Sequence, residues 1–480
     1  MAGPVNGISI AAHKIKDTEA KELKRFEDAR PDADTDNNSG MEPKTISKDL
    51  KKALYRYRWA IFIILTSAYF FVYFHRMSVG IVGRDIIDDV GGTVGLLSSV
   101  YFWTYAAMQI PSGLLADHLG PRKATFIFLI IAAAGSFLTF MGTEFWEIVL
   151  GKILIAAGMA VIYIPLMKII SVWYGKADFP QLTGIVIAVG NVGAIAASAP
   201  LEMMAEALGW RDVFLVLGVV TLVLALLCLA FVRDHPHKKG FPAIEEIENR
   251  EKGTPISDAT DSKLPMIKGL IMVASGGRKF WTLAIAYFLV YGSIMVFQGT
   301  WANIYFKEIY GFGTSAALLI TILGIGKILS TAVIGVMNGR GVIRSKRTAM
   351  FWGTLLYTAT WGIIWAFAGH LDSYWFWMTI CFVFGFSGGF MTLSFTQVKE
   401  WYPTAISGTS VSAMNVFLFL GASVCTTITA PIIGTTYSLE NFAFVWALMF
   451  AMSVFALLMV VLSIEKKESD PFVGTENRGV

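Results

Sequence analysis

Charged residues are scarce in this chain of 480 residues. Asp, Glu, Lys and Arg make up 15 % of it, whereas hydrophobic residues make up 55 %. The mean hydropathy of +0.60 lies far above that of a soluble domain, so this composition excludes an ordinary soluble fold. The formal net charge of +4 is too small to indicate a nucleic-acid partner.

Cysteine is rare as well. The three cysteines, Cys228, Cys381 and Cys425, all lie in apolar segments, which favours small core residues over a disulfide or zinc framework. The first fifty residues contain no apolar h-region, so we expect no signal peptide. The chain also shows no metal cluster, nucleophile constellation or nucleotide-binding loop. We therefore expect no metal, no cofactor and no enzymatic activity.

Long apolar segments are abundant. A bilayer core requires roughly 20 apolar residues per helix, and the chain offers such segments at short spacing. We predict an all-α integral membrane protein with twelve membrane helices in two six-helix bundles. The approximate spans are 59–83, 93–117, 122–141, 145–173, 180–205, 211–232, 280–305, 315–338, 347–369, 373–399, 405–433 and 441–464.

Polar segments precede, separate and follow the two predicted six-helix bundles. We expect a disordered cytoplasmic tail over residues 1–55, because this stretch is polar and poor in aromatic residues. The first bundle then covers 56–232 and the second 280–465. A cytoplasmic central loop at 233–279 separates them, and a second cytoplasmic tail covers 466–480.

The short loops alternate in charge. One set carries Lys51, Lys52, Arg56, Arg58, Arg122, Lys123, Arg340, Arg344, Lys346, Arg347, Lys466 and Lys467. The other set carries Asp85, Asp88, Asp89, Glu144, Glu147, Glu202, Glu206, Asp372 and Glu440. Because Lys and Arg are enriched in cytoplasmic loops, both termini are expected in the cytoplasm. We expect a multi-pass protein of a prokaryotic inner membrane that functions as a monomer.

The loop between the second and third predicted helices reads "GLLADHLGPRKA", residues 113–124. It resembles the signature loop G-x-L-A-D-x-x-G-x-R-K of the major facilitator superfamily. The matching residues are Gly113, Asp117, Gly120, Arg122 and Lys123. The resemblance implies a cytoplasmic latch that stabilises the outward-facing state, with an ordinary topology-setting basic loop as the alternative.

The corresponding loop of the second half is "GVMNGRGVIRSKR", residues 335–347. Gly335, Gly341, Lys346 and Arg347 suit the same pattern, but Gly339 stands where the acidic residue belongs. This weak repeat fits two halves related by a pseudo-two-fold axis.

The first predicted helix contains "YFFVYFHRMS", residues 69–78, which resembles the organophosphate:phosphate antiporter branch of that superfamily. In this branch an arginine of the first helix binds the substrate phosphate, and Arg76 matches it. The branch also has a second arginine, where this chain has Val290, and a histidine, where it has Gly190. The paired-arginine phosphate clamp is thus incomplete.

Arg76 is an unusual residue for a membrane helix. An arginine at the helix centre raises the free energy of membrane insertion by about 2.5–3.5 kcal/mol. Tyr69, Tyr73 and Arg76 share one helix face at i, i+4 and i+7. We interpret this face as an anion site, since a guanidinium can grip a carboxylate or phosphate bidentately. The alternative is a side chain that snorkels to the outer surface. His75 is rotated by about 100° from Arg76, so it packs against a neighbouring helix or acts as a proton-linked group.

Other polar residues lie within the predicted helices. We hypothesise that Lys327 supplies the second-half cation that is missing at Val290; the alternative is a lysine bonded to facing backbone carbonyls. Lys168 is a candidate for the cytoplasmic gate, unless it merely snorkels. The remaining candidates for substrate binding are Tyr101, Tyr105, Gln109, Tyr287, Tyr291, Gln298 and Asn415. For each of these, interhelical hydrogen bonding is the alternative.

These features together predict a secondary transporter that moves a small organic anion, such as a sugar phosphate, phosphonate or carboxylate, across the lipid bilayer by alternating access. The central helices carry cations but no carboxylate at mid-depth, which favours anion exchange, while proton coupling through His75 stays open. The alternatives are a transporter-like ligand sensor and an exporter of amphipathic compounds.

Overall fold

The computed structural model describes residues 48–242 and 271–465, except Lys176 and Pro403, together with Ile244 and Ile247. All regular elements within these residues are helices. The predicted tails up to residue 47 and from residue 466, and most of the predicted central loop, lie outside the described residues.

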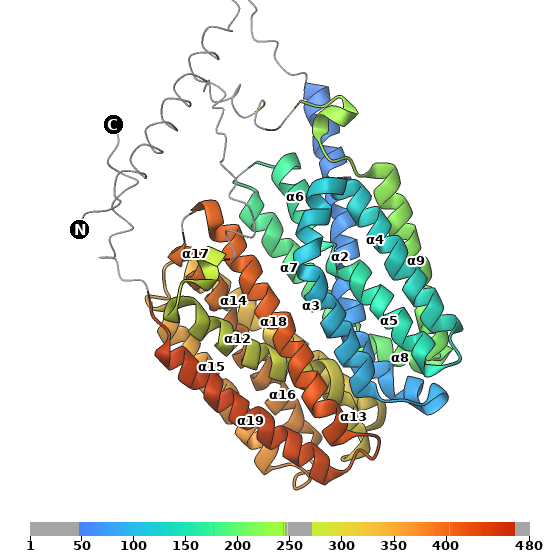
Figure 1. Cartoon of the computed structure of the whole chain (residues 1–480), viewed down its shortest axis with the longest axis vertical. Coiled ribbons are helices and arrows are strands. Elements are labelled where there is room, and N and C mark those ends of the chain that lie inside the picture. The colour runs from blue at the N-terminus through green and yellow to red at the C-terminus, as the bar shows by residue number, and fades with distance from the viewer. Residues whose placement is uncertain are drawn as a thin grey trace, which may run out of the picture. The chain divides into compact units, whose positions relative to one another are not determined.

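The first half of the chain forms six helical spans, two of which are interrupted (Figure 1). The elements are α2 (Lys48–Val90), α3 (Val94–Leu119), α4 (Pro121–Met141), α5 (Phe145–Ala160), α6 (Tyr163–Trp173), α7 (Phe179–Ala196), α8 (Ala199–Leu208) and α9 (Trp210–Phe231). Helix α4 packs along α5 and α9, and α2 packs along α7. A short 3-10 helix, η1 (Pro236–Lys239), follows α9.

The second half repeats this order. Its elements are α12 (Arg278–Val296), the π-helix η2 (Phe297–Trp301), α13 (Ala302–Glu308), η3 (Gly313–Ser315), α14 (Ala316–Gly339), α15 (Lys346–Ala366), α16 (Tyr374–Gly388), η4 (Gly389–Thr392), α17 (Leu393–Trp401), α18 (Thr404–Ile433) and α19 (Leu439–Leu462). Within this half α14 packs along α16, and α12 packs along α18. Between the halves, α3 runs beside α18 (Figure 1).

All twelve predicted segments are helical in the structure. Among the described residues, ten helical stretches are long and apolar enough to cross a membrane. The other two segments are α3 and α15, which have 26 and 21 residues. Their length suffices for a bilayer, but polar residues such as Ser98, Tyr105 and Gln109 lower the hydropathy of α3. The predicted all-α membrane fold of two six-helix bundles is confirmed.

Helix α2 extends beyond its predicted span at both ends. Residues 48–55, which we assigned to the tail, form its first turns. There Arg58 stacks on Tyr55 and Tyr174, with its guanidinium carbon 4.2 and 4.5 Å from the ring centroids. Such cation–π contacts stabilise helical turns outside the apolar core, and a hydropathy pattern does not register them.

Two segments of the first half that we predicted as single α-helices are interrupted, as are 280–305 and 373–399 of the second half, which η2 and η4 divide. Val161 and Ile162 separate α5 from α6, and Ala197 and Ser198 separate α7 from α8. A proline lies in the first turn of each following helix, Pro165 in α6 and Pro200 in α8. Proline has no N–H and clashes with the preceding turn, so each break relieves a conflict that hydropathy alone cannot reveal.

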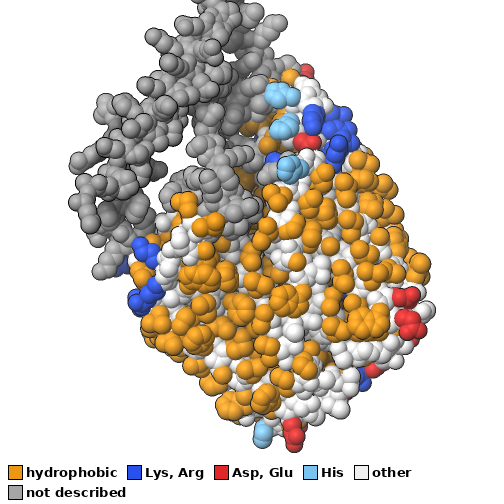
Figure 2. Space-filling view, in the orientation of Figure 1, with side chains coloured by type: hydrophobic (Ala, Val, Ile, Leu, Met, Phe, Trp, Pro, Cys, Tyr) orange, Lys and Arg blue, Asp and Glu red, His pale blue; other side chains and the backbone are white. Residues whose placement is uncertain are grey.

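Charge is distributed unequally between the two ends of the helices. We call the end where α2 begins the basic end and the opposite end the far end. Figure 2 shows hydrophobic side chains over most of the visible face, with Lys and Arg gathered mainly towards the basic end and acidic side chains mainly towards the far end. This distribution matches the alternating loop charges of the sequence.

Candidate functional site

A cavity of about 600 Å³ lies between the two halves of the protein. Its lining includes six tyrosines, Tyr69, Tyr73, Tyr105, Tyr163, Tyr287 and Tyr291. Three amides also line it, Gln109, Asn191 and Asn415, together with the two cations Arg76 and Lys327. None of its described lining residues is an Asp or Glu. The cavity is therefore cationic and aromatic.

Arg76 is enclosed by aromatic rings. Its guanidinium carbon lies 4.4 Å from the ring centroid of Tyr73 and 4.9 Å from those of Tyr105 and Phe419. Its Nη1 donates a long hydrogen bond of 3.4 Å to the hydroxyl of Tyr291, while the buried Nε has no hydrogen-bond partner among the described residues. The side chain is 5 % exposed and lines the cavity, so it does not snorkel to a membrane surface.

Lys327 reaches the same cavity from the other half. Its ammonium lies 5.5 Å from the ring centroid of Tyr291, the tyrosine that Arg76 contacts. Val290, the residue in place of the branch's second arginine, is buried and does not line the cavity. One cation from each half thus lies against a single tyrosine.

Gly190 makes room for the tyrosine wall of the first half. A Cβ atom at this position would lie 2.9 Å from the Tyr69 ring and 3.0 Å from the Tyr73 ring. The centroid of Tyr69 lies 5.3 Å from those of both Tyr73 and Tyr163. The absence of the branch's histidine at Gly190 thus allows these rings to pack there.

Three of the sequence-predicted residues lie outside the cavity lining. Tyr101 and Gln298 are buried without lining it. His75 is fully buried, and neither of its ring nitrogens has a hydrogen-bond partner among the described residues. Conversely, sequence reasoning missed Tyr163 and Phe419. Phe419 lies within an apolar run, where nothing in the sequence distinguishes a cavity residue from a core residue. Tyr163 reaches the cavity because the helix breaks just before α6, and the sequence does not predict that break.

The predicted latch residues lie at the basic end. Gly120 links α3 to α4 with a φ of +77°, a conformation that favours glycine. The backbone N–H of Arg122 donates to Asp234 Oδ1 at 2.8 Å, and its Nη2 donates to the Leu229 carbonyl at 2.5 Å. Lys168 Nζ donates to the Ala116 carbonyl at 3.2 Å. Lys123 is exposed and Gly113 half-buried, and the Asp117 side chain lies outside the description.

Asp234 is the acceptor that fixes this loop. Burial alone would raise the pKa of its carboxyl, but the Arg122 N–H and the Lys238 ammonium, 2.9 Å away, hold that pKa below its ordinary value. The carboxylate therefore stays ionised at neutral pH and keeps its hydrogen bond to α4.

The second half repeats this arrangement despite its degenerate motif. The backbone N–H of Lys346 donates to Glu465 Oε1 at 2.6 Å, as that of Arg122 does to Asp234. Arg347 Nη2 donates to the Val461 carbonyl near the end of α19, as Arg122 Nη2 does near the end of α9. The pseudo-symmetry is thus visible in equivalent contacts.

Contacts between the halves close the far end. Asn303 Nδ2 donates to the Ile81 carbonyl and to Glu202 Oε2, both at 3.3 Å. Lys307 pairs with the same carboxylate, and Arg84 pairs with Glu308 at 3.5 Å. The cavity lining, in contrast, reaches Ala274 and Trp281 near the start of α12. The cavity therefore extends towards the basic end.

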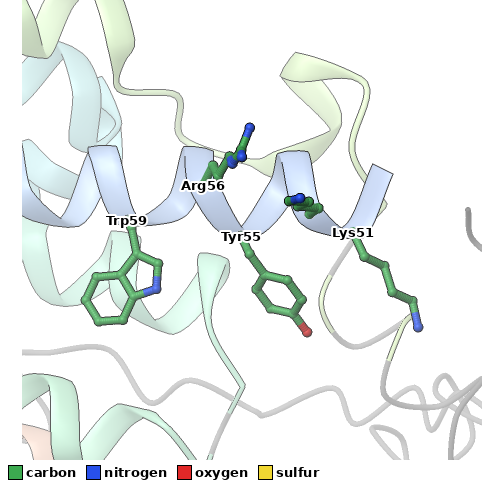
Figure 3. A pocket seen from close by; sticks show the side chains of 5 residues that line it. Lys51, Tyr55, Arg56 and Trp59 are labelled. Carbon is green, nitrogen blue, oxygen red and sulfur yellow. The ribbon is translucent and has the colours of Figure 1, made fainter. Parts of the chain in front are cut away.

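A second, shallow hollow lies at the start of α2, lined by Lys51, Lys52, Tyr55, Arg56 and Trp59. Figure 3 shows Tyr55 and Trp59 pointing to one side of the helix and Arg56 to the other. These side chains come from a single helix and do not converge on an enclosed space. Basic residues next to aromatic ones are typical of a membrane–water interface.

Known proteins are similar to this chain in sequence. The probable sulfoacetate transporter SauU of Cupriavidus necator is 25 % identical over 304 residues, covering 62 % of this chain and 69 % of that protein. The membrane sensor protein UhpC of Escherichia coli strain K12 is 24 % identical over 394 residues, covering 78 % and 85 %.

A solved structure supports the fold. The bacterial homolog of the human lysosomal transporter Spinster, in an inward-facing and unoccupied conformation, superposes with a TM-score of 0.62 at 16 % identity. The superposition covers 85 % of this chain and 96 % of that one. The family model of the Major Facilitator Superfamily matches residues 65–425 and 283–479. With its two six-helix bundles and its central cavity, this chain belongs to the major facilitator superfamily.

Proposed function

We propose that this protein is a secondary transporter that carries a small organic anion across the membrane, with Arg76 as the anchor of the anion. The observation that carries the proposal is the charge of the cavity. Arg76 and Lys327 both line it, and no described lining residue is acidic. A buried cation without a counter-ion is costly, and an anionic substrate would remove that cost.

The geometry favours an anion with more than one acidic oxygen. A guanidinium offers parallel N–H donors that match a carboxylate, sulfonate or phosphate, and the Nε of Arg76 has no partner within the described part of the chain. Lys327 adds a compact charge from the other half. Sulfoacetate, named for the relative from Cupriavidus necator, carries two anionic groups and suits such a pair.

The arrangement of the halves supports alternating access. The far end is closed by contacts between the halves, such as that of Asn303 with Ile81 and Glu202, whereas the cavity extends to the basic end. If basic loops face the cytoplasm, both termini are cytoplasmic and this conformation faces inward. Transport then proceeds by anion exchange or with proton coupling, for which His75 is a candidate group.

A ligand sensor is the second candidate function, because the relative from Escherichia coli bears that name. The same cavity would serve a sensor, which binds its ligand without carrying it across. Counterflow of a radiolabelled anion in proteoliposomes separates the two functions, since only a transporter exchanges internal for external anion. The cationic cavity disfavours the exporter of amphipathic compounds.

The decisive binding test compares the wild type with Arg76→Gln. We expect glucose 6-phosphate, sulfoacetate or galactarate to raise the melting temperature of the wild type, because a ligand that binds only the folded state stabilises it. Arg76→Gln should lose this shift, whereas Arg58→Gln, which changes an arginine that stacks on Tyr55 and Tyr174 outside the cavity, should keep it. Equal stabilisation of all three proteins by neutral or cationic compounds alone would refute the anion site.

A further inference from the structure

Three polar side chains lie between the cavity and the far end. Helix α3 begins at the far end with Val94, so Ser98 and Tyr101 precede the cavity residue Tyr105 along it. Gln298 of η2 lies beyond the cavity residue Tyr291 on the path towards the far end. The exposed fractions of Ser98, Tyr101 and Gln298 are 1 %, 1 % and 4 %.

Each of these side chains has a buried polar atom without a partner. The Ser98 Oγ, the Tyr101 hydroxyl and the Gln298 Oε1 make no hydrogen bond of good geometry within the described part of the chain, although the Tyr101 hydroxyl lies close to the Arg76 guanidinium. Most other buried serines are satisfied locally, although Ser330 Oγ also lacks a partner: Ser136 Oγ, for example, donates to the Ala132 carbonyl at 3.1 Å. Because buried polar groups are nearly always hydrogen-bonded, three orphaned groups in one layer require an explanation.

Protein atoms seal this layer on both sides. Towards the cavity, the Tyr101 ring stacks on that of Tyr105, with centroids 6.1 Å apart. Towards the far end, α2 and η2 approach so closely that a Cβ on Gly80 would lie 2.8 Å from the Gly299 carbonyl carbon. The layer thus separates the cavity from the contacts that close the far end.

We propose that Ser98, Tyr101 and Gln298 line the transport path on the far side of Arg76, and that they become hydrated when the far end opens. This inference rests on the proposed transport by alternating access. In the open state the hydroxyl and amide N–H groups can donate to the oxygens of the passing anion. Being neutral, they offer the anion hydrogen bonds without holding it as firmly as Arg76 does. Water then donates to the Gln298 Oε1, so that all three orphaned atoms have partners in the second conformation.

Cysteine accessibility tests this proposal. In a background without Cys228, Cys381 and Cys425, the variants Ser98→Cys and Gln298→Cys are treated with the membrane-impermeant thiol reagent MTSET, in both right-side-out cells and inside-out vesicles. We expect both to react from the membrane face opposite the cavity mouth, and Asn415→Cys, in the cavity lining, to react from the other face. Ser136→Cys, fully buried in α4, is the unreactive control.

Opening the far end should increase this reaction. Glu202→Gln removes the carboxylate that holds Asn303 and Lys307, so we expect it to accelerate labelling of Ser98→Cys and Gln298→Cys by about tenfold. The proposal is overturned if neither cysteine reacts from the far side in the Glu202→Gln background, while Asn415→Cys reacts from the cavity side.

A measurement without introduced cysteines guards against misfolded variants. Hydroxyl-radical footprinting should oxidise Tyr101 faster in Glu202→Gln than in the wild type, whereas Tyr357, fully buried within the second half, should not change. Equal rates at Tyr101 would contradict the proposal. Neither readout needs a substrate. If no anion stabilises the protein, the anion site is refuted but the proposed path is not. If anions stabilise the protein but labelling and oxidation fail as described, the path is refuted but the anion site is not.

Discussion

At the scale of single residues, the sequence predicted the helix face of Arg76 correctly, but it did not predict how far the cavity extends along the helices. The i, i+4, i+7 spacing of Tyr69, Tyr73 and Arg76 predicts one shared face, and all three line the cavity. Gln298 was assigned to the cavity on the same reasoning as Tyr291, but lies beyond it. Helical spacing predicts the face of a helix, whereas the depth at which a cavity ends depends on the opposite half.

The buried charge of Lys152 should reduce the stability of the folded protein, and this effect can be measured. Its ammonium is fully buried, 3.3 Å from the Ser78 hydroxyl and 4.2 Å from the Phe214 ring centroid, and no ion pair involving it is present in the described chain. Taking a single charged group out of water into a protein interior costs on the order of several kcal/mol in desolvation free energy, and an apolar side chain of similar volume avoids this cost. We therefore expect Lys152→Met to raise the melting temperature in detergent.

Lys152→Ala serves as the control for this change. It removes the same charge but leaves a void, so it should gain less stability than Lys152→Met. If Lys152→Met has a lower melting temperature than the wild type, the ammonium stabilises the folded state, and the interpretation of Lys152 as a destabilising residue is wrong.

At the scale of elements, the sequence predicted the helices but not their interruptions. Apolar runs cover the breaks at Val161 and Ala197 without a change in hydropathy. The π-helix η2 is equally silent in sequence, although it brings Gly299 against Gly80 of α2. Such irregular turns depend on how closely the facing helix packs against them, and this packing cannot be predicted from a single sequence.

The contact between α2 and η2 yields a prediction at this scale. A Cβ on Gly80 would lie 2.8 Å from both the carbonyl carbon and the carbonyl oxygen of Gly299, which are backbone atoms that cannot rotate away. Gly80→Ala should therefore hinder closure of the far end and favour the conformation in which that end is open. Electron–electron distances between spin labels on the far-end loops of the two halves should lengthen.

Gly335→Ala in α14 is the matched control, because a Cβ there meets nothing within 4 Å. It should leave the distance distribution of the wild type unchanged. Identical distributions for Gly80→Ala and the wild type would show that the two helices can separate slightly without opening the far end.

At the scale of the whole molecule, transport requires the halves to part at the far end. Here the backbone N–H of Ala199, at the start of α8, donates to Thr321 Oγ1 of α14 at 3.2 Å. A disulfide between Ala199→Cys and Thr321→Cys should fix the halves in this conformation. We expect oxidation to abolish counterflow, reduction to restore it, and anion binding from the basic end to persist throughout. Full counterflow in the cross-linked protein would show that transport does not require the halves to separate at this contact.

The two positive charges of the cavity carry a consequence for energised membranes. Arg76 and Lys327 line the cavity and no described lining residue is acidic, so under the proposed alternating access the empty cavity would present two charges to whichever side it faces. Moving one elementary charge across 100 mV is worth about 2.3 kcal/mol. We therefore expect a membrane potential that is negative inside to draw the empty cavity inward, and a bound dianion, which would cancel both charges, to make the loaded protein insensitive to voltage.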